Sequence, residues 1–126
     1  MTFRESLDRH LEAIRRRAVH ALAETVDADE VVLVTADGDV STDPERFLEL
    51  HREWFATDGW TLDAELLHTR EVGDLATAVL RLDYREDRPD GSRRQESILS
   101  LVFRRRDGRW VLVQDQNTPI ADGSSG

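Results

Sequence analysis

Cysteine and lysine are both absent from this chain of 126 residues, and each absence excludes a class of chemistry. Without cysteine there can be no disulfide, no thiol nucleophile and no thiolate metal site. Without lysine there can be no Schiff base and no catalytic side-chain amine, because every one of the 17 basic side chains is an arginine.

Long apolar runs are missing as well, so no segment is predicted to cross a bilayer. The first ten residues, MTFRESLDRH, lack the apolar core of a signal peptide, and we expect a cytoplasmic protein with no membrane partner. The formal charge of −9 argues against a nucleic-acid partner, because phosphate backbones require clustered cations. No two histidines have a metal-ligand spacing and no glycine-rich phosphate loop is present, so we expect neither a metal nor a cofactor.

The length of the chain suits one domain with a single hydrophobic core. We place this domain at residues 1–121. The remaining residues, 122–126, are composed like a linker or a disordered tail and are left outside the predicted fold.

The first half of the domain carries helical patterns around a short hairpin. Apolar residues recur at three- and four-residue steps from Phe3 to about Thr25, which predicts one long amphipathic helix. A β-branched run, residues 30–35, and a brief partner around Val40 predict the hairpin. Asp43 or its neighbour Thr42 can then cap a second helix, with Pro44 in its first turn.

The second half of the domain is predicted to be an antiparallel meander. Its short separators exclude parallel neighbours, which need long crossovers. The four predicted strands are residues 60–72, 74–86, 94–106 and 109–117. Strands of this length in a small domain must twist and bend, so we predict an α+β, cone-shaped fold with helices on one face of a strongly curved sheet.

The stretch from Ser97 to Ile120 is the most informative part of the sequence. Its Asp107-Gly108 pair, between two apolar runs, is a strong signal for a tight hairpin. The second strand begins apolar and ends in a polar cluster, residues 114–118. A strand with this composition indicates a chain that passes from a core to the mouth of a cavity.

The order of elements and the closing hairpin, FRRRDGRWVLV (residues 103–113), resemble the nuclear transport factor 2-like superfamily. The similarity is greatest to its SnoaL-like and ketosteroid-isomerase-like branch. Many relatives follow such a hairpin with an acid and then a histidine. Here Asp115 keeps the acid and Gln116 stands at the usual histidine position, which argues against a mechanism that depends on that histidine.

The resemblance implies a conical fold with a ligand pocket, and a homodimer packed through the sheet. It does not imply one activity, because the superfamily holds isomerases, cyclases, dehydratases, epoxide hydrolases and members without catalysis. The isomerases carry a tyrosine on the first helix, whereas the one tyrosine of this chain, Tyr84, lies on a predicted strand. We therefore do not transfer the catalytic residues of the isomerases.

Asp115 and His51 are the candidate catalytic residues. Asp115 ends an otherwise apolar strand, and burial there would raise the pKa of its carboxyl toward that of a general acid or base. His51 lies one helical turn from both Phe47 and Phe55, so it should face the interior. Alternatively, Asp115 anchors the C-terminal segment and His51 is a core residue. The histidines at positions 10 and 20 are predicted to lie on the surface.

Further residues are candidates for contacts with a small apolar or amphipathic molecule. Aromatic and amide side chains suit a mostly apolar pocket with a few hydrogen-bonding groups. His68 shares strand parity with Leu62 and Leu66, so it is predicted to face the same side. The full set is Trp54, Trp60, His68, Tyr84, Gln114, Gln116 and Asn117.

Two functional hypotheses follow. The first is a cofactor-free enzyme that performs acid–base chemistry on a small, largely apolar substrate. The second is a binding or dimerisation module of the same fold without chemistry, which the missing helix-one tyrosine and the glutamine at position 116 favour.

Overall fold

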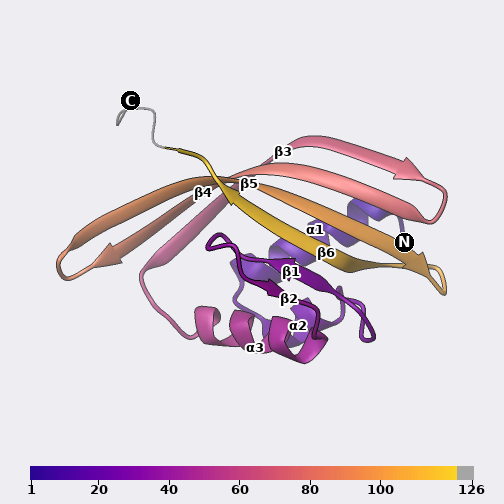
Figure 1. Ribbon diagram of the computed structural model, residues 1–126, viewed down its shortest axis with the longest axis horizontal. Coiled ribbons are helices and arrows are strands. Elements are labelled where there is room, and N and C mark those ends of the chain that lie inside the picture. Colours follow the sequence, from indigo (N-terminus) through magenta and orange to yellow (C-terminus); the bar gives the residue numbers. More distant parts are fainter. Residues whose placement is uncertain (122–126) are drawn as a thin grey trace.

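Helices pack against one face of a six-stranded sheet in the computed structural model, which describes residues 1–121 (Figure 1). The predicted α+β class is confirmed, while residues 122–126, predicted as a tail, lie outside the described part. In chain order the elements are α1 (Phe3–Arg15), α2 (Val19–Ala23), β1 (Val32–Val34), β2 (Val40–Ser41), α3 (Pro44–Phe55), β3 (Trp60–Val72), β4 (Leu75–Arg88), β5 (Gly91–Arg106) and β6 (Arg109–Pro119).

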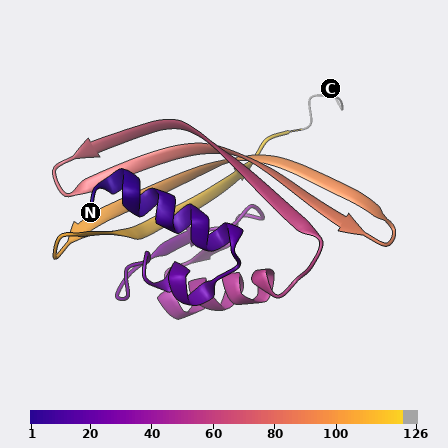
Figure 2. The same cartoon turned by 180° about the vertical axis from the view of Figure 1, so that it is seen from behind.

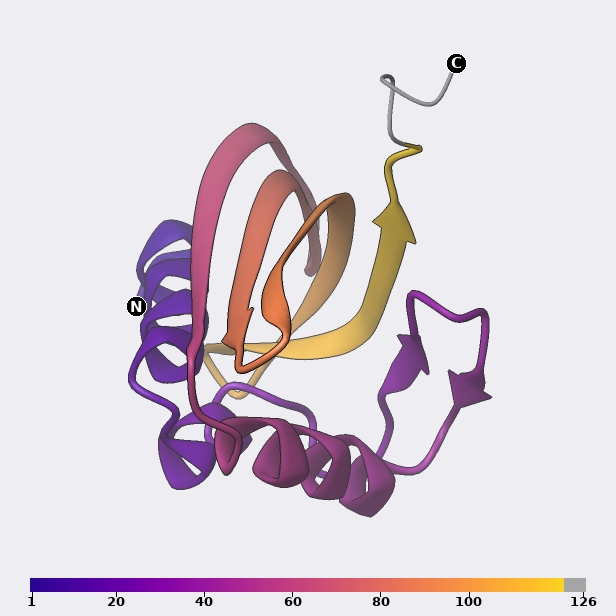
Figure 3. The same ribbon diagram turned by 90° about the vertical axis from the view of Figure 1, so that its left-hand side faces the viewer.

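The sheet has the strand order β2-β1-β6-β5-β4-β3. The four long strands, β3 to β6, form the predicted antiparallel meander, whereas the short β1 pairs parallel to β6. Figure 3 shows the long strands bending around a concave face, with the helices gathered beside and below it. The face of the sheet that meets the helices is called the inner face below, and the opposite one the outer face.

The N-terminal helical segment is broken, which corrects the prediction of one helix from Phe3 to Thr25. Helix α1 ends at Arg15 with Arg16 as its C-cap, and Arg17 has a positive φ of 55°. The amide of Ala18 bonds to the Ala13 carbonyl, and that of Arg17 to the Ile14 carbonyl, which is a Schellman ending. The guanidinium of Arg17 donates to the Trp60 carbonyl at 2.6 Å and lies over the Trp60 ring at 4.2 Å, and these contacts offset the cost of a left-handed conformation for a residue other than glycine.

Local sequence signals locate the start of α3 and the closing turn correctly, whereas the predicted separator at residues 87–92 is shorter in the structure, because β4 and β5 pair as far as Arg88 and Gly91. Asp43 caps α3 by accepting a hydrogen bond from the amide of Glu45, and Pro44 follows in the first turn. Asp107 and Gly108 have φ values of 53° and 78°, as the two central residues of a type I′ hairpin turn require.

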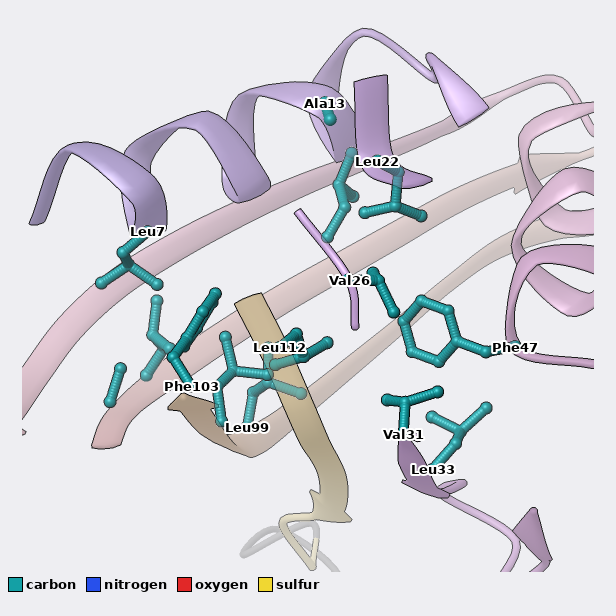
Figure 4. Close-up of a cluster of buried hydrophobic side chains, with 14 of the residues drawn as sticks. Leu7, Ala13, Leu22, Val26, Val31, Leu33, Phe47, Leu99, Phe103 and Leu112 are labelled. Atoms are coloured by element: carbon teal, nitrogen blue, oxygen red, sulfur yellow. The ribbon is translucent and has the colours of Figure 1, made fainter. Parts of the chain in front are cut away.

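The hydrophobic core lies between the inner face and the helices. Figure 2 shows α1 lying along the long strands, and Figure 4 shows side chains from α1, α2, α3 and the strands converging. Leu7, Leu22, Phe47, Phe103 and Leu112 are completely buried there. The amphipathic faces that the sequence predicts for the helices are the faces buried in this core.

Two β-bulges interrupt the alternation of side chains along the strands. In β3, Leu66 pairs with Leu80 and His68 with Val79, which leaves Leu67 as an extra residue. In β6, Leu112 pairs with Phe103 and Gln114 with Val102, which leaves Val113 as an extra residue. Each bulge reverses the parity of all the residues that follow it, so it decides which side chains reach the inner face.

Asp27 anchors the connection between α2 and β1 under the closing hairpin. Its fully buried side chain accepts hydrogen bonds from the amides of Asp29 (2.8 Å) and Glu30 (3.2 Å). The guanidinium of Arg106, at the end of β5, approaches the same oxygen at 3.3 Å. Asp29 also pairs with Arg106, at 2.8 Å, but its side chain is exposed.

We predict that Asp27→Ala lowers the free energy of unfolding by about 2 kcal/mol, because two backbone amides in a part-buried turn lose their acceptor. Asp29→Ala is the matched control: it removes a carboxylate from the same arginine at an exposed position and should have a much smaller effect. Urea denaturation of the three proteins measures the difference. Equal losses for both variants would contradict the anchoring role of Asp27.

Candidate functional site

A cavity of about 370 Å³ opens between the inner face, α1, α3 and the segment that follows β1. Aliphatic side chains such as Leu11, Leu82 and Leu99 supply much of its wall. The polar side chains that reach the wall are Thr35, His51, Tyr84, Gln95, Ser97, Asp115 and Asn117. The volume and this mixture are typical of a pocket for a small organic molecule.

The bulge at Val113 places Asp115 in the cavity wall. Trp110 and Leu112 face inward before the bulge, and Asp115 and Asn117 face inward after it. Without the extra residue, the alternation that begins at Trp110 and Leu112 would have continued at Gln114. Asp115 therefore stands opposite Leu101, and Asn117 opposite Leu99, on the inner face.

The Asp115 carboxyl is buried without a partner. Its residue is 6% exposed, and no protein group within residues 1–121 donates a hydrogen bond to its side chain. Burial raises the pKa of Asp115 to about 7, because transfer out of water penalises the charged form. Near neutral pH the carboxyl is therefore present in both its acidic and its basic forms.

His51 lines the same cavity from α3. Its Nδ1 donates to the Phe47 carbonyl oxygen at 2.8 Å, and its ring stacks on Phe47 with 4.2 Å between centroids. Burial lowers the pKa of His51, and the hydrogen bond to Phe47 partly opposes this effect. The ring is therefore neutral at physiological pH, with its free lone pair on Nε2.

Aromatic side chains form one end of the cavity. Trp54 and Tyr84 line it, with their ring centroids 6.2 Å apart. Trp60 lies behind them: it is 4% exposed, stacks on Trp54 at 4.4 Å and donates from Nε1 to the Trp54 carbonyl. The structure thus gives Trp60 a packing position that supports the wall.

The remaining candidates from the sequence lie away from the cavity. Gln114 pairs with Val102 and Gln116 with Ser100 on the outer face, because the β6 bulge reverses their parity. His68 is exposed and pairs with Val79 on the outer face, because the bulge at Leu67 cancels the parity that it shares with Leu62 and Leu66. In total, the structure brings Asp115, His51, Trp54, Tyr84 and Asn117 together at the cavity.

His10 is completely buried, which corrects the prediction of a surface position. The Thr25 hydroxyl donates to the Leu22 carbonyl, so its oxygen accepts from Nδ1 of His10 at 2.8 Å. Nε2 then carries a lone pair that is buried and has no partner among the described residues. Burial, and to a smaller extent repulsion from His51, lower the pKa of His10 to about 3.

Sequence reasoning also missed the β4–β5 end of the cavity. Gln95 and Ser97 share strand parity with Leu99 and Leu101, and this pattern could have located them on the inner face. Tyr84 pairs directly with Gln95. These three side chains and Asn117 form a polar line along the inner face that begins at Asp115.

Within residues 1–121, no three His, Asp or Glu side chains are grouped so that they could hold a metal ion. In the same part of the chain, every helix is too short or too polar to span a bilayer.

Comparison with known proteins places the chain in a family. The family model of the SnoaL-like domain matches residues 4–121. The chain belongs to the SnoaL-like family. A search of curated protein sequences finds no match to this SnoaL-like protein.

Solved structures share the fold of the SnoaL-like protein at low sequence identity. A proposed dehydratase of the nuclear transport factor 2-like family from Streptomyces avermitilis has a TM-score of 0.81 and 18% identity over 93% of each chain. A ketosteroid isomerase-like protein from Erwinia carotovora atroseptica has a TM-score of 0.79 and 15% identity over 94% of each chain. A proposed calcium/calmodulin-dependent protein kinase type II association domain from Thiobacillus denitrificans has a TM-score of 0.81 and 15% identity, over 95% of this chain and 96% of that one. The fold is therefore shared with proteins that carry different names.

The raised pKa of Asp115 predicts a specific dependence of stability on pH. The pKa in the folded protein exceeds the ordinary value of about 3.9, so the folded state binds this proton more tightly than the unfolded chain. The resulting stabilisation is complete below about pH 4 and is lost as the pH rises through about 7. Asp115→Asn should therefore gain stability relative to the natural protein across this range, by as much as about 4 kcal/mol.

Denaturant unfolding of both proteins between pH 4 and pH 8 tests this prediction. A stability difference that is constant over the range would show that Asp115 titrates normally. Gln116→Ala, on the outer face of the same strand, should run parallel to the natural protein at every pH.

Proposed function

We propose that this SnoaL-like protein is a cofactor-independent enzyme that performs acid–base chemistry on a small, largely apolar substrate, with Asp115 as the group that moves the proton. The observation that carries the proposal is the Asp115 carboxyl, which lies in the cavity wall without a protein partner and has a pKa of about 7. A general acid or base is most effective when its pKa lies near the working pH.

The two protonation states of Asp115 suit two kinds of step. As a carboxylate, it would take a proton from the carbon next to a carbonyl and return that proton to another carbon, which is an isomerisation. As a carboxylic acid, it would give its proton to a departing hydroxyl or to an epoxide oxygen, as a dehydratase or an epoxide hydrolase requires. A cyclase would use the first kind of step, followed by attack of the carbanion on a second carbonyl.

Other side chains of the cavity would assist. The free Nε2 of neutral His51 would accept a second proton, and the amide of Asn117 would donate to a substrate oxygen on which negative charge develops. The aliphatic wall and Trp54 favour an apolar body, because apolar surface gains most from removal from water. The phenol of Tyr84 would contact the substrate at the aromatic end of the cavity.

Asp115→Asn should lower turnover at least about 100-fold, because the amide cannot exchange the proton. The assay uses β,γ-unsaturated ketones, aryl epoxides and β-hydroxy ketones as substrates, one class for each reaction type, and follows product formation. Gln116→Ala is the control and should retain full turnover, since its side chain lies on the outer face. Full turnover by Asp115→Asn on any accepted substrate would overturn the proposed mechanism.

A ligand-binding or assembly module without chemistry is the second candidate function. One observation favours it: no described protein group donates a hydrogen bond to the Asp115 carboxyl, whereas catalytic acids are usually held by hydrogen bonds. The structural similarity to a proposed kinase association domain is consistent with this alternative. Ligand that copurifies with the protein, together with an inactive substrate panel, would support it.

We also propose a homodimer that packs through the outer face. Val79, Ile98, Val102 and Val111 occupy this face and remain partly exposed in the single chain. Such an apolar strip gains stability when a second copy covers it.

Light scattering should therefore give twice the monomer mass for the natural protein and the monomer mass for Val102→Asp, which places a charge in the middle of the outer face. Val40→Asp, at an exposed valine of β2, is the control and should remain dimeric. A monomeric natural protein at micromolar concentration would contradict the proposed interface.

A further inference from the structure

The charged groups of the cavity wall have one sign. Asp115, His51 and Tyr84 are the ionisable side chains that line it, and none of the arginines of the chain does so. The arginines lie elsewhere: Arg94 pairs with Asp83 at 3.0 Å, Arg105 with Asp74 at 2.8 Å, and Arg106 with the segment at Asp27. Since His51 is neutral, the only full charge that residues 1–121 place in the wall near neutral pH is the negative charge of Asp115.

A buried carboxylate without a partner is costly, and a ligand group of opposite charge offsets more of that cost than a neutral hydrogen-bond donor does. A protonated amine would place an ammonium group against Asp115 and form a charge-assisted hydrogen bond. A ligand carboxylate would add a second negative charge with no arginine to offset it. The cavity is therefore poised to distinguish ligands by charge.

The register of the strands also gives the ligand a direction. Asp115 stands opposite Leu101, whereas Tyr84 stands opposite Gln95, and these two positions are separated by about 20 Å along β5. Trp54 stands beside Tyr84. A ligand whose polar group meets Asp115 would thus extend its apolar body over the aliphatic wall in the direction of Trp54 and Tyr84.

We propose that the cavity selects its ligand by charge, binding an apolar amine in its protonated form with Asp115 as the counter-ion and rejecting the corresponding carboxylic acid. This inference rests on the proposed function, in which Asp115 is the working group of the cavity. It adds the chemical class of ligand that this site prefers.

The pairing is linked to protons. The ammonium pairs with the ionised carboxyl, so affinity for the amine rises as the pH increases through about 7 and declines only when the amine itself loses its proton. The further ionisable groups that line the cavity are His51 from α3 and Tyr84 from β4. Helix α1, strands β1, β3 and β5, and the segment after β1 contribute uncharged side chains to the wall.

Isothermal titration calorimetry at pH 8 and low salt tests the proposal with three ligands of one shape: 2-naphthylmethylamine, 2-naphthylmethanol and 2-naphthoic acid. We expect the amine to bind about tenfold more tightly than the alcohol, and the acid to bind most weakly. In Asp115→Asn the amine and the alcohol should bind within about threefold of each other. Asp83→Asn is the matched control, because it removes the same charge from the outer face and should keep the preference for the amine.

Equal affinities for the amine and the acid, a preference for the amine that survives in Asp115→Asn, or an amine that does not bind at millimolar concentration would each overturn the proposal. Binding of the alcohol to Asp115→Asn shows that the variant has kept its cavity. The proposed mechanism and the selection by charge can be contradicted independently of each other. Turnover that persists in Asp115→Asn removes the proposed mechanism, whereas lost turnover with equal affinities for the three ligands removes only the selection by charge.

Discussion

One constraint governs the molecule: along a β-strand, successive side chains must point to opposite faces, and only a bulge can change that order. The inner face of the sheet is the floor of both the core and the cavity, so every residue of β3 to β6 belongs either to the interior or to the outer face. The extra residue at Val113 keeps Trp110 and Leu112 in the core and turns Asp115 inward beyond them. Without this one inserted residue in β6, Gln114 and Gln116 would face the interior. With it, the strand places the acid Asp115 in the cavity wall.

Burial of Asp115 has two consequences that cannot be separated. Asp115 is buried opposite Leu101, and this burial raises the pKa of its carboxyl toward the range useful for proton transfer. The same desolvation makes the ionised form unfavourable and lowers stability at high pH. His51 shows the opposite arrangement, because the Phe47 carbonyl satisfies one ring nitrogen and leaves the other as a neutral acceptor. In the cavity wall, the Asp115 carboxyl therefore has no hydrogen-bond donor among the described residues, and the His51 ring has a partner for one of its two nitrogens.

The sequence predicts the fold through signals that act locally. The Asp107-Gly108 pair predicts a type I′ turn, Asp43 predicts a helix cap, and both are found. The break between α1 and α2 is not predictable in this way, because the left-handed conformation of Arg17 depends on its contact with Trp60, which lies 43 residues further along the chain. His10 is another such case: on the sequence it is a polar residue of an amphipathic helix, and only the tertiary contact with Thr25 explains its burial.

The candidate site is predictable from the sequence only as far as strand parity holds. His68 and Gln116 are assigned to the cavity by composition or alternation, and bulges that have no glycine or proline to mark them turn both to the outer face. The same bulge in β6 turns Asp115 and Asn117 toward the cavity. It follows that a polar cluster at a strand end identifies the place of a site, whereas the register of the neighbouring strand decides which members of the cluster belong to it. In this protein the pairing of Asp115 with Leu101 places the acid on the inner face. The described neighbours of Asp115 there are apolar, so a hydrogen-bond partner for its carboxyl can come from a ligand in the cavity or from water.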